Sequence, residues 1–172
     1  MNIFKTAPKF IQGYLETKRY NSLKGEIQRK RDEGDIEGEK NLIHFGQRRW
    51  VENLTEKYHV TYEVRGEENI PGEDDGPFMI YCNHQGYADL MATMWLMRKH
   101  GMIAYVAKED WRKYGVLRDA IIYTRSLFLV RDNPKEAVRT LAEAKKNLGL
   151  GFNLLIFPEG TRSKGHEMGE FK

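Results

Sequence analysis

Apolar residues in the first third of the chain recur at intervals of three and four, which is the period of an amphipathic helix. The pattern runs from residue 8 to about residue 56. A charged middle, residues 26–40, interrupts it, because only Ile27 and Ile36 are apolar there and two glycines break the helical period. We therefore predict two helices joined by a polar, mobile segment.

The spacing of apolar residues changes to every second position from Tyr58. There Val60, Tyr62 and Val64 alternate with polar residues, which predicts a strand with one solvent-exposed face. An acidic connector, residues 67–76, follows. Short apolar runs then alternate with helical patterns to the end of the chain. The predicted strands are 78–82, 103–107, 127–130 and 152–157, and the predicted helices are 88–99, 116–123 and 135–148.

Strict alternation of strand and helix favours right-handed crossovers and parallel strands. The expected fold is α/β, with a largely parallel central sheet, alternating helices and a preceding amphipathic helical segment. The chain has 172 residues, 40% of them apolar, which is enough for one sizeable core. We divide it into an N-terminal helical segment, residues 1–57, and an α/β domain, residues 58–172.

The positive charge of the chain is concentrated at its beginning. Residues 1–32 carry eight Lys and Arg against three acidic residues, whereas the whole chain has a formal net charge of +3. With Phe10, Ile11 and Tyr14 beside these cations, the first helix is able to lie flat in an anionic lipid interface. The alternative is a helix that packs on the protein's own core with a solvated basic face. No groove-reading motif appears, so we expect no nucleic-acid partner.

Composition excludes several classes of protein. No window approaches the ~20 apolar residues that cross a bilayer, and the first residues form no apolar signal segment. The single cysteine, Cys82, excludes an intramolecular disulfide framework. The histidines other than His84 show no metal-ligand spacing, so we expect no metal site; they are His44, His59, His100 and His166.

Residues able to do chemistry follow the predicted strand ends. In parallel α/β sheets, ligands bind beyond the carboxyl ends of the strands. In this chain those positions hold His84 and Asp89, then Lys108, then Arg131, and finally the loop 158–163. A basic rim with one imidazole suits a phosphorylated substrate and proton transfer.

The loop after the last predicted strand has the composition of an anion site. Gly160 lets backbone approach a ligand closely, and Thr161 and Ser163 offer hydroxyl groups. Arg162 offers a rigid fork of donors that suits phosphate, and Glu159 can hold that fork or bond a hydroxyl. A solvated turn between strand and helix is the alternative interpretation of this loop.

His84 and Asp89 are five residues apart. If His84 ends the strand and Asp89 lies in the first turn of the next helix, the carboxylate can reach the imidazole and fix its tautomer. The other ring nitrogen is then free to take a proton from a hydroxyl, and backbone N–H groups after His84 are candidate oxyanion donors. Cys82, two residues before His84, also allows a thiol nucleophile, although a small buried strand residue is its ordinary role.

Two of these segments, taken in order, resemble a known family. Asn83-His84-Gln85-Gly86-Tyr87-Ala88-Asp89 and the later Phe157-Pro158-Glu159-Gly160-Thr161-Arg162-Ser163 resemble the first and third blocks of the glycerolipid acyltransferases of the 1-acylglycerol-3-phosphate acyltransferase type. Lys108 resembles a lysine found between those blocks. Residues 127–131 resemble the second block, which ends in an arginine. The resemblance covers about residues 78–172.

This resemblance implies transfer of an acyl group from a thioester donor, either acyl-CoA or acyl carrier protein, to 1-acyl-glycerol 3-phosphate, which gives phosphatidate. Glycerol 3-phosphate or another lyso-lipid is the alternative acceptor. His84 would be the general base and Asp89 its partner. The substrate-binding residues would be Arg131, Glu159, Gly160, Thr161, Arg162 and Lys108. The resemblance also implies no bound cofactor and a peripheral protein at the cytoplasmic face of a membrane, without a transmembrane helix.

The chain departs from the family pattern in two respects. Arg125 stands where the second block opens with glycine, and Val130 stands where an acid precedes the arginine. We expect the Arg125 side chain to change what can approach the acceptor site. The chain also ends at Lys172, where the family continues, so we expect the α/β domain to lack its C-terminal part.

A function of a different class is a non-catalytic peripheral module. Such a module would bind anionic lipid through the basic N-terminal segment and the arginine rim. The pairing of His84 with Asp89 argues against it, because binding of phosphate needs cations and not an imidazole with a carboxylate.

Overall fold

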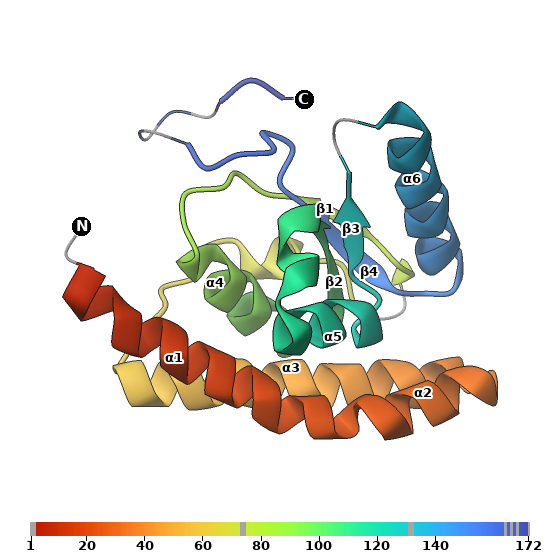
Figure 1. Ribbon diagram of the computed structural model, residues 1–172, viewed down its shortest axis with the longest axis horizontal. Helices are drawn as coiled ribbons and strands as arrows, with labels where there is room; N and C mark the ends of the chain where they lie inside the picture. The colour runs from red at the N-terminus through yellow and green to blue at the C-terminus, as the bar shows by residue number, and fades with distance from the viewer. Residues whose placement is uncertain are drawn as a thin grey trace.

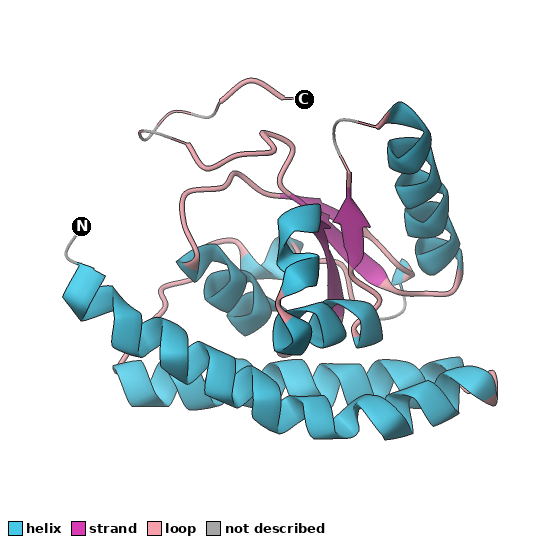
Figure 2. Ribbon diagram, viewed as in Figure 1, coloured by secondary structure: helices cyan, strands magenta, loops and turns pink. Residues whose placement is uncertain are grey.

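Four parallel strands form the centre of the protein, as predicted. The computed structural model describes residues 3–72, 75–130, 133–163, 165, 167 and 169–171. The strands are β1 (Met79–Tyr81), β2 (Ile103–Lys108), β3 (Leu127–Leu129) and β4 (Asn153–Ile156), and their order in the sheet is β1-β4-β2-β3 (Figures 1 and 2). β1 and β4 are therefore neighbours, so the residues that follow them are brought to the same edge of the sheet.

The helices between these strands also match the sequence pattern. They are α4 (Ala88–Met97), α5 (Gly115–Tyr123) and α6 (Pro134–Gly149). Asn133 caps α6, because its side chain accepts hydrogen bonds from the N–H groups of Lys135 and Glu136. Between β2 and α5 lies a 3₁₀ helix that was not predicted, Glu109–Lys113. Two shorter 3₁₀ helices occupy Asn21–Leu23 and Glu67–Asn69.

The charged middle of the N-terminal segment is helical, so the predicted mobile join is wrong. The helices are α1 (Ile3–Tyr20), α2 (Lys24–Asp32) and α3 (Ile36–Tyr58), and they form a layer along one side of the molecule (Figure 1). Gly34, at φ +71°, makes the turn between α2 and α3. Asp35 then caps α3 by accepting the Gly38 N–H at 2.8 Å.

The strand predicted at residues 58–64 does not form. Tyr58 ends α3, and His59 turns the chain with a φ of +51°. No strand is assigned between there and β1 in the described residues. The alternation in this stretch has a different cause, because Tyr62 stacks on Trp95 of α4 with ring centroids 5.0 Å apart while Val64 is exposed.

The N-terminal helices share a core with the sheet. Ile27 of α2 and Ile43 of α3 are buried in one cluster with Ala104 of β2, Leu154 of β4 and Phe152. A second cluster on the sheet holds Met97, Ile103, Tyr105 and Leu155. The boundary that we drew at residue 57/58 stays a prediction about domains, but the helices before it bury apolar surface against the strands after it.

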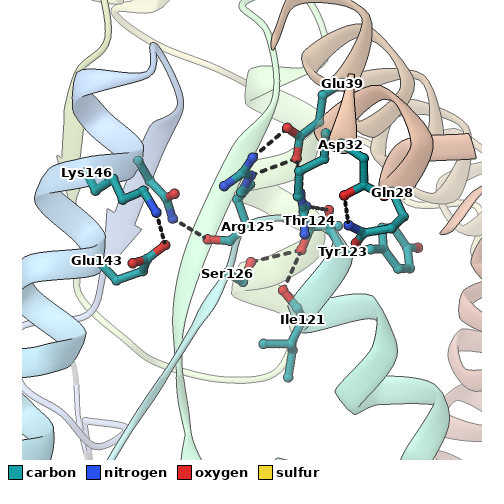
Figure 3. A network of polar contacts seen from close by, with 12 residues as sticks. Gln28, Asp32, Glu39, Ile121, Tyr123, Thr124, Arg125, Ser126, Glu143 and Lys146 are labelled. Carbon is teal, nitrogen blue, oxygen red and sulfur yellow. Dashed lines mark hydrogen bonds and ion pairs between the residues drawn. The ribbon is translucent and has the colours of Figure 1, made fainter. Parts of the chain in front are cut away.

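A buried ion cluster fastens the helical layer to the start of β3 (Figure 3). The Glu39 side chain is fully buried and accepts from the Arg31 Nε at 2.8 Å. It also binds the Arg125 guanidinium in bidentate fashion, with both N···O distances 2.7 Å. Arg31 donates further to the Tyr123 carbonyl at 3.0 Å. Paired charged residues therefore occupy buried positions between α2, α3 and the sheet. For this reason the pattern of apolar residues alone did not show that residues 26–40 are helical.

None of the helices in the described part of the chain combines the length and the apolar character needed to cross a bilayer.

Candidate active site

His84 and Asp89 meet as predicted. The chain turns after β1, and Asp89 lies in the first turn of α4, where the helix dipole favours a carboxylate. Asp89 Oδ2 lies 2.6 Å from His84 Nδ1. The same oxygen accepts the N–H groups of Gln85 at 2.7 Å and Gly86 at 3.0 Å. The carboxylate is thus held in place by the backbone and in turn orients the imidazole.

These contacts remove two candidate oxyanion donors. The N–H groups of Gln85 and Gly86 follow His84 directly, as the sequence analysis required, but both point at Asp89. An N–H group that already donates to a carboxylate is not available to a developing oxyanion. These two groups therefore support the catalytic pair and do not bind the reacting carbonyl.

The His84 ring has one open nitrogen. Its side chain is 23% exposed, and the ring stacks on Phe157 with centroids 4.2 Å apart. Nδ1 is occupied by Asp89, and no described residue bonds Nε2. An imidazole fixed at Nδ1 and accessible at Nε2 can accept a proton from a bound hydroxyl.

Glu159 holds the loop after β4 against the His84 backbone. Its carboxylate is only 1% exposed, and both of its oxygens have protein donors. Oε1 accepts the His84 N–H at 3.0 Å, and Oε2 accepts the Ser163 hydroxyl at 2.7 Å and the Gly169 N–H at 2.9 Å. These hydrogen bonds, led by that from Ser163, lower the pKa of Glu159, so the group is held as an anion.

Ser163 closes the same arrangement from the other side. Its backbone N–H donates to the His84 carbonyl at 2.6 Å. The loops after β1 and β4 are thereby joined through both the N–H and the C=O of His84. From the sequence, Ser163 was predicted only as a hydroxyl in an anion site, and the stacking of Phe157 on His84 was not predicted. Both lie in the segment that carries the family resemblance, so that segment was the available signal.

The predicted phosphate-binding residues lie at the surface of this edge. Gly160 has a φ of +63°, which a residue with a side chain rarely adopts. Thr161 and Arg162 are exposed, and the Arg162 guanidinium lies 4.7 Å from the centre of the Tyr87 ring. Arg162 and the His84 loop are therefore neighbours, because Tyr87 lies between His84 and Asp89 in that loop.

The other two predicted cations have different outcomes. Lys108 is the last residue of β2, is 58% exposed and forms an ion pair with Asp110, whose pKa is lowered by that hydrogen bond. It is available to a ligand, because exposed ion pairs are weak. Arg131 lies outside the described residues, so its predicted role stays a prediction.

Arg125 does not face the predicted acceptor site, contrary to expectation. It precedes β3 and so stands at the amino end of the sheet, whereas the His84 site lies beyond the carboxyl ends. Its side chain is only 12% exposed and is bound by Glu39. Its φ of +61° is in the left-handed region, which explains why glycine suits this position in the family.

Cys82 has the properties of a structural thiol. It follows β1 and does not share a strand with His84, because β1 ends at Tyr81. Burial raises its pKa, and the nearby carboxylates of Asp89 and Glu159 raise it further. A thiol held protonated is a poor nucleophile. The described residues also contain no group of His, Cys, Asp and Glu able to hold a metal ion.

The comparisons with known proteins agree with the resemblance. Residues 61–172 match the model of the family described as Acyltransferase. The 1-acyl-sn-glycerol-3-phosphate acyltransferase of Cocos nucifera is 34% identical over 96 residues, which are 53% of this chain and 29% of the relative. The lyso-ornithine lipid O-acyltransferase of Rhodobacter capsulatus is 30% identical over 141 residues, which are 76% of this chain and 46% of the relative.

A solved structure has a similar fold. The crystal structure of the 1-acyl-sn-glycerophosphate acyltransferase PlsC from Thermotoga maritima is 26% identical, with a TM-score of 0.63. The match covers 95% of this chain and 67% of that one. The chain thus spans less than half the length of the two curated relatives and about two thirds of the solved one.

Proposed function

The chain belongs to the acyltransferase family, and we propose that it transfers a fatty acyl group from a thioester donor to the free hydroxyl of 1-acyl-glycerol 3-phosphate, forming phosphatidate. The observation that carries this proposal is the 2.6 Å contact between His84 Nδ1 and Asp89 Oδ2, which leaves Nε2 without a bond to any described residue, in a side chain that is 23% exposed. A general base in this arrangement accelerates a reaction by roughly 10²- to 10⁴-fold.

The reaction needs no acyl-enzyme. His84 Nε2 takes the proton of the acceptor hydroxyl as its oxygen attacks the thioester carbonyl carbon, which forms the new C–O bond. The tetrahedral intermediate then expels the thiolate, and the C–S bond breaks. The proton held by His84 passes to the leaving sulfur, so the free base is restored. Asp89 stabilises the imidazolium between these two steps.

The acceptor's phosphate is assigned to the exposed cations and the turn beside His84. Arg162 and Lys108 are accessible, and Arg131 follows β3 in sequence. Gly160 and Thr161 add a turn whose backbone a phosphate can approach closely. Phosphate bound there would place the free hydroxyl of the glycerol beside Nε2.

Glu159 takes a different role in this proposal from the one first predicted. Its two oxygens already accept from His84, Ser163 and Gly169, and the carboxylate is buried. A negative charge would also repel the acceptor's phosphate. We assign Glu159 to positioning the His84 backbone and the loop that follows β4, and not to direct contact with the acceptor.

A second acceptor is favoured by one of the relatives. The Rhodobacter capsulatus protein is named a lyso-ornithine lipid O-acyltransferase, and it aligns over 76% of this chain. Acylation of another lyso-lipid is therefore the alternative to acylation of 1-acyl-glycerol 3-phosphate. The His84 chemistry is the same in both cases, because each acceptor presents a free hydroxyl. The donor in either case is acyl-CoA or acyl carrier protein.

The first helix supports a peripheral contact with a membrane. Ile11, Tyr14 and Leu15 are 60%, 43% and 49% exposed, and their spacing of three and four puts them on one face of α1. Lys18 and Arg19 follow at the end of the helix. An exposed apolar face next to cations suits an anionic lipid interface.

Vesicles of anionic lipid should therefore sediment the wild-type protein and retain less of an Ile11→Ser/Leu15→Ser variant. Equal retention of the two proteins would show that this face of α1 does not bind the membrane.

The central experiment supplies labelled acyl-CoA with lysophosphatidate or with lyso-ornithine lipid and detects the acylated product. Formation of phosphatidate that is lost in His84→Ala would support the proposal. Turnover of lyso-ornithine lipid alone would favour the second acceptor. Lipid binding without turnover of either acceptor would favour the non-catalytic module, and turnover undiminished in His84→Ala would exclude the mechanism.

A further inference from the structure

A concave site lies along the outer edge of β3, and its lining does not include His84 or Asp89. It is an open groove of about 470 Å³ between β3, α6 and the end of α5. The described residues that line it include four arginines and one acid, Glu143. The arginines are Arg31, Arg112, Arg125 and Arg139, and the aromatic ring of Phe128 lies among them. Figure 3 shows part of this groove: Arg125 and Ser126 lie just before β3, and Glu143 lies on α6, where it pairs with Lys146.

The inner part of the groove keeps a positive charge although its cations are paired. Arg31 and Arg125 are 20% and 12% exposed, and both bind the single buried carboxylate of Glu39. Two guanidinium groups sharing one carboxylate leave a net charge of +1 in a partly buried position. An anion that enters the groove gains from this charge, because the surroundings screen it less than water would.

The outer part carries two arginines that are able to turn toward a ligand. Arg112 is 51% exposed and binds Glu109, and Arg139 is 77% exposed and binds Glu136. Each of these acids is three residues before its arginine, and such exposed pairs contribute little energy. A phosphate is a stronger partner for a guanidinium than a solvated carboxylate, because it accepts bidentate hydrogen bonds and carries more charge.

The groove is connected to the candidate active site through aromatic side chains. Arg112 lies over the Phe128 ring at 4.2 Å. Its neighbour Trp111 meets the Tyr87 ring, edge to face, with centroids 6.4 Å apart. Tyr87 belongs to the His84–Asp89 loop. β3 is three positions from β1 in the sheet, so the groove and the His84 site are offset by about 14 Å across the strands, at ~4.8 Å per strand. The Arg125 end of the groove is further from His84, because it lies at the amino end of the sheet and His84 lies beyond the carboxyl end. The pantetheine arm of CoA would therefore have to be extended.

We propose that this groove binds the phosphorylated nucleotide end of an acyl-CoA donor, while its pantetheine arm passes Trp111 and delivers the thioester to His84. This assignment rests on the proposed acyltransferase function and names the donor class for the same reaction. The concave shape and the volume suit a nucleotide, which fills a pocket of this size. A carrier protein would instead dock through an interface of about 800 Å² per partner, which is larger than a groove that holds one nucleotide.

The test measures binding without turnover, in the His84→Ala protein by titration calorimetry. The probes are CoA, adenosine 3′,5′-bisphosphate and 4′-phosphopantetheine. We expect CoA and the bisphosphate to bind, and Arg112→Ala and Arg139→Ala each to weaken both by about tenfold, the usual loss for one charge-assisted contact to phosphate. Arg49→Ala is the matched control, because Arg49 on α3 is likewise exposed and paired, with Glu52, but lies outside the groove. We expect no change for it.

Several results would overturn the groove assignment. The first is that CoA does not bind, and the second is that Arg112→Ala and Arg139→Ala leave its binding unaltered. The third is arginine-dependent binding of phosphopantetheine but not of the bisphosphate, which would assign the groove to the phosphopantetheine arm of a carrier protein. The proposed function fails separately. If arginine-dependent CoA binding occurs but the wild-type protein acylates no acceptor, the groove stands and the acyltransferase proposal does not.

Discussion

Two buried carboxylates organise this molecule in opposite ways. Glu159 and Glu39 are 1% and 0% exposed. Glu159 accepts from two backbone N–H groups and one hydroxyl, all neutral donors, around His84. Glu39 accepts from two arginines, one on α2 and one at the start of β3. One carboxylate therefore orders a loop at the candidate active site, and the other neutralises charge between the helical layer and the sheet.

Because the donors differ, the two regions should respond differently to substitution. Backbone donors fix geometry, because they come from a chain that has few other conformations open to it. A buried charge pair contributes to stability mainly because each charge compensates the other, so the loss of one partner leaves an unpaired charge in the core and lowers the free energy of unfolding. Changes near Glu159 should therefore appear in the rate of acyl transfer, and changes near Glu39 should appear in the stability of the fold.

The largest expected effect is on the reaction itself. His84→Ala should lower kcat by roughly 10²- to 10⁴-fold, because it removes the imidazole that would take the proton of the acceptor hydroxyl. Denaturant unfolding should change little, since the ring is partly exposed. Steady-state assays with acyl-CoA and lysophosphatidate measure this. His59→Asn is the control, as His59 is exposed and Asn tolerates its left-handed backbone. Full activity in His84→Ala would show that His84 is not the general base, and would contradict the catalytic role given to the region around Glu159.

The next effect is on stability. Glu39→Gln should reduce the free energy of unfolding by about 3–5 kcal/mol, because it leaves Arg31 and Arg125 buried without a countercharge. Urea denaturation followed by circular dichroism measures this loss. Glu37→Gln, on the same helix but with an exposed side chain paired to Lys40, should cost less than about 1 kcal/mol. Equal effects of the two substitutions would contradict the role given to Glu39.

A smaller effect separates positioning from binding. Glu159→Gln keeps the shape of the side chain but turns an amide NH₂ toward protein donors, so the His84 backbone should shift. We expect kcat to fall by about 10- to 100-fold, the range that a small misplacement can cause, with KM for the acceptor nearly unchanged. Glu170→Gln, an exposed position, is the control. A raised KM with unchanged kcat would restore the acceptor-binding role first predicted for Glu159.

The smallest effect is on the pH dependence of stability. Hydrogen bonds from Ser163, His84 and Gly169 lower the pKa of Glu159. A carboxyl with a lowered pKa in the folded state contributes stability that is present above its ordinary value of about 4.3 and is lost as pH falls through the lowered pKa. Unfolding free energies of wild type and Glu159→Gln, measured between about pH 5 and pH 3, should therefore converge toward the acid end. Parallel curves would show that no such contribution exists.

Two of the predictions that failed concern secondary structure, and both failures have physical causes. The helical period fails at residues 26–40 because only Ile27 and Ile36 supply apolar contacts with the core there, while the buried position 39 holds an acid that pairs with Arg31 and Arg125. The alternation of Val60 and Tyr62 is a strand signal, but a strand also needs a neighbour to pair with. Here Tyr62 finds its contact on Trp95 instead.

The amino-acid pattern alone predicts the order of strands and helices from β1 onward and the pairing of His84 with Asp89. Both depend on local spacing, which a short stretch of chain contains in full. The tertiary structure decided which distant groups meet: Glu159 with the His84 backbone, 75 residues apart, and Glu39 with Arg125, 86 residues apart. The order β1-β4-β2-β3 and the packing of α2 and α3 create those contacts and the arginine groove. Local periodicity does not contain them, because it records which face of an element is apolar but not what packs against it.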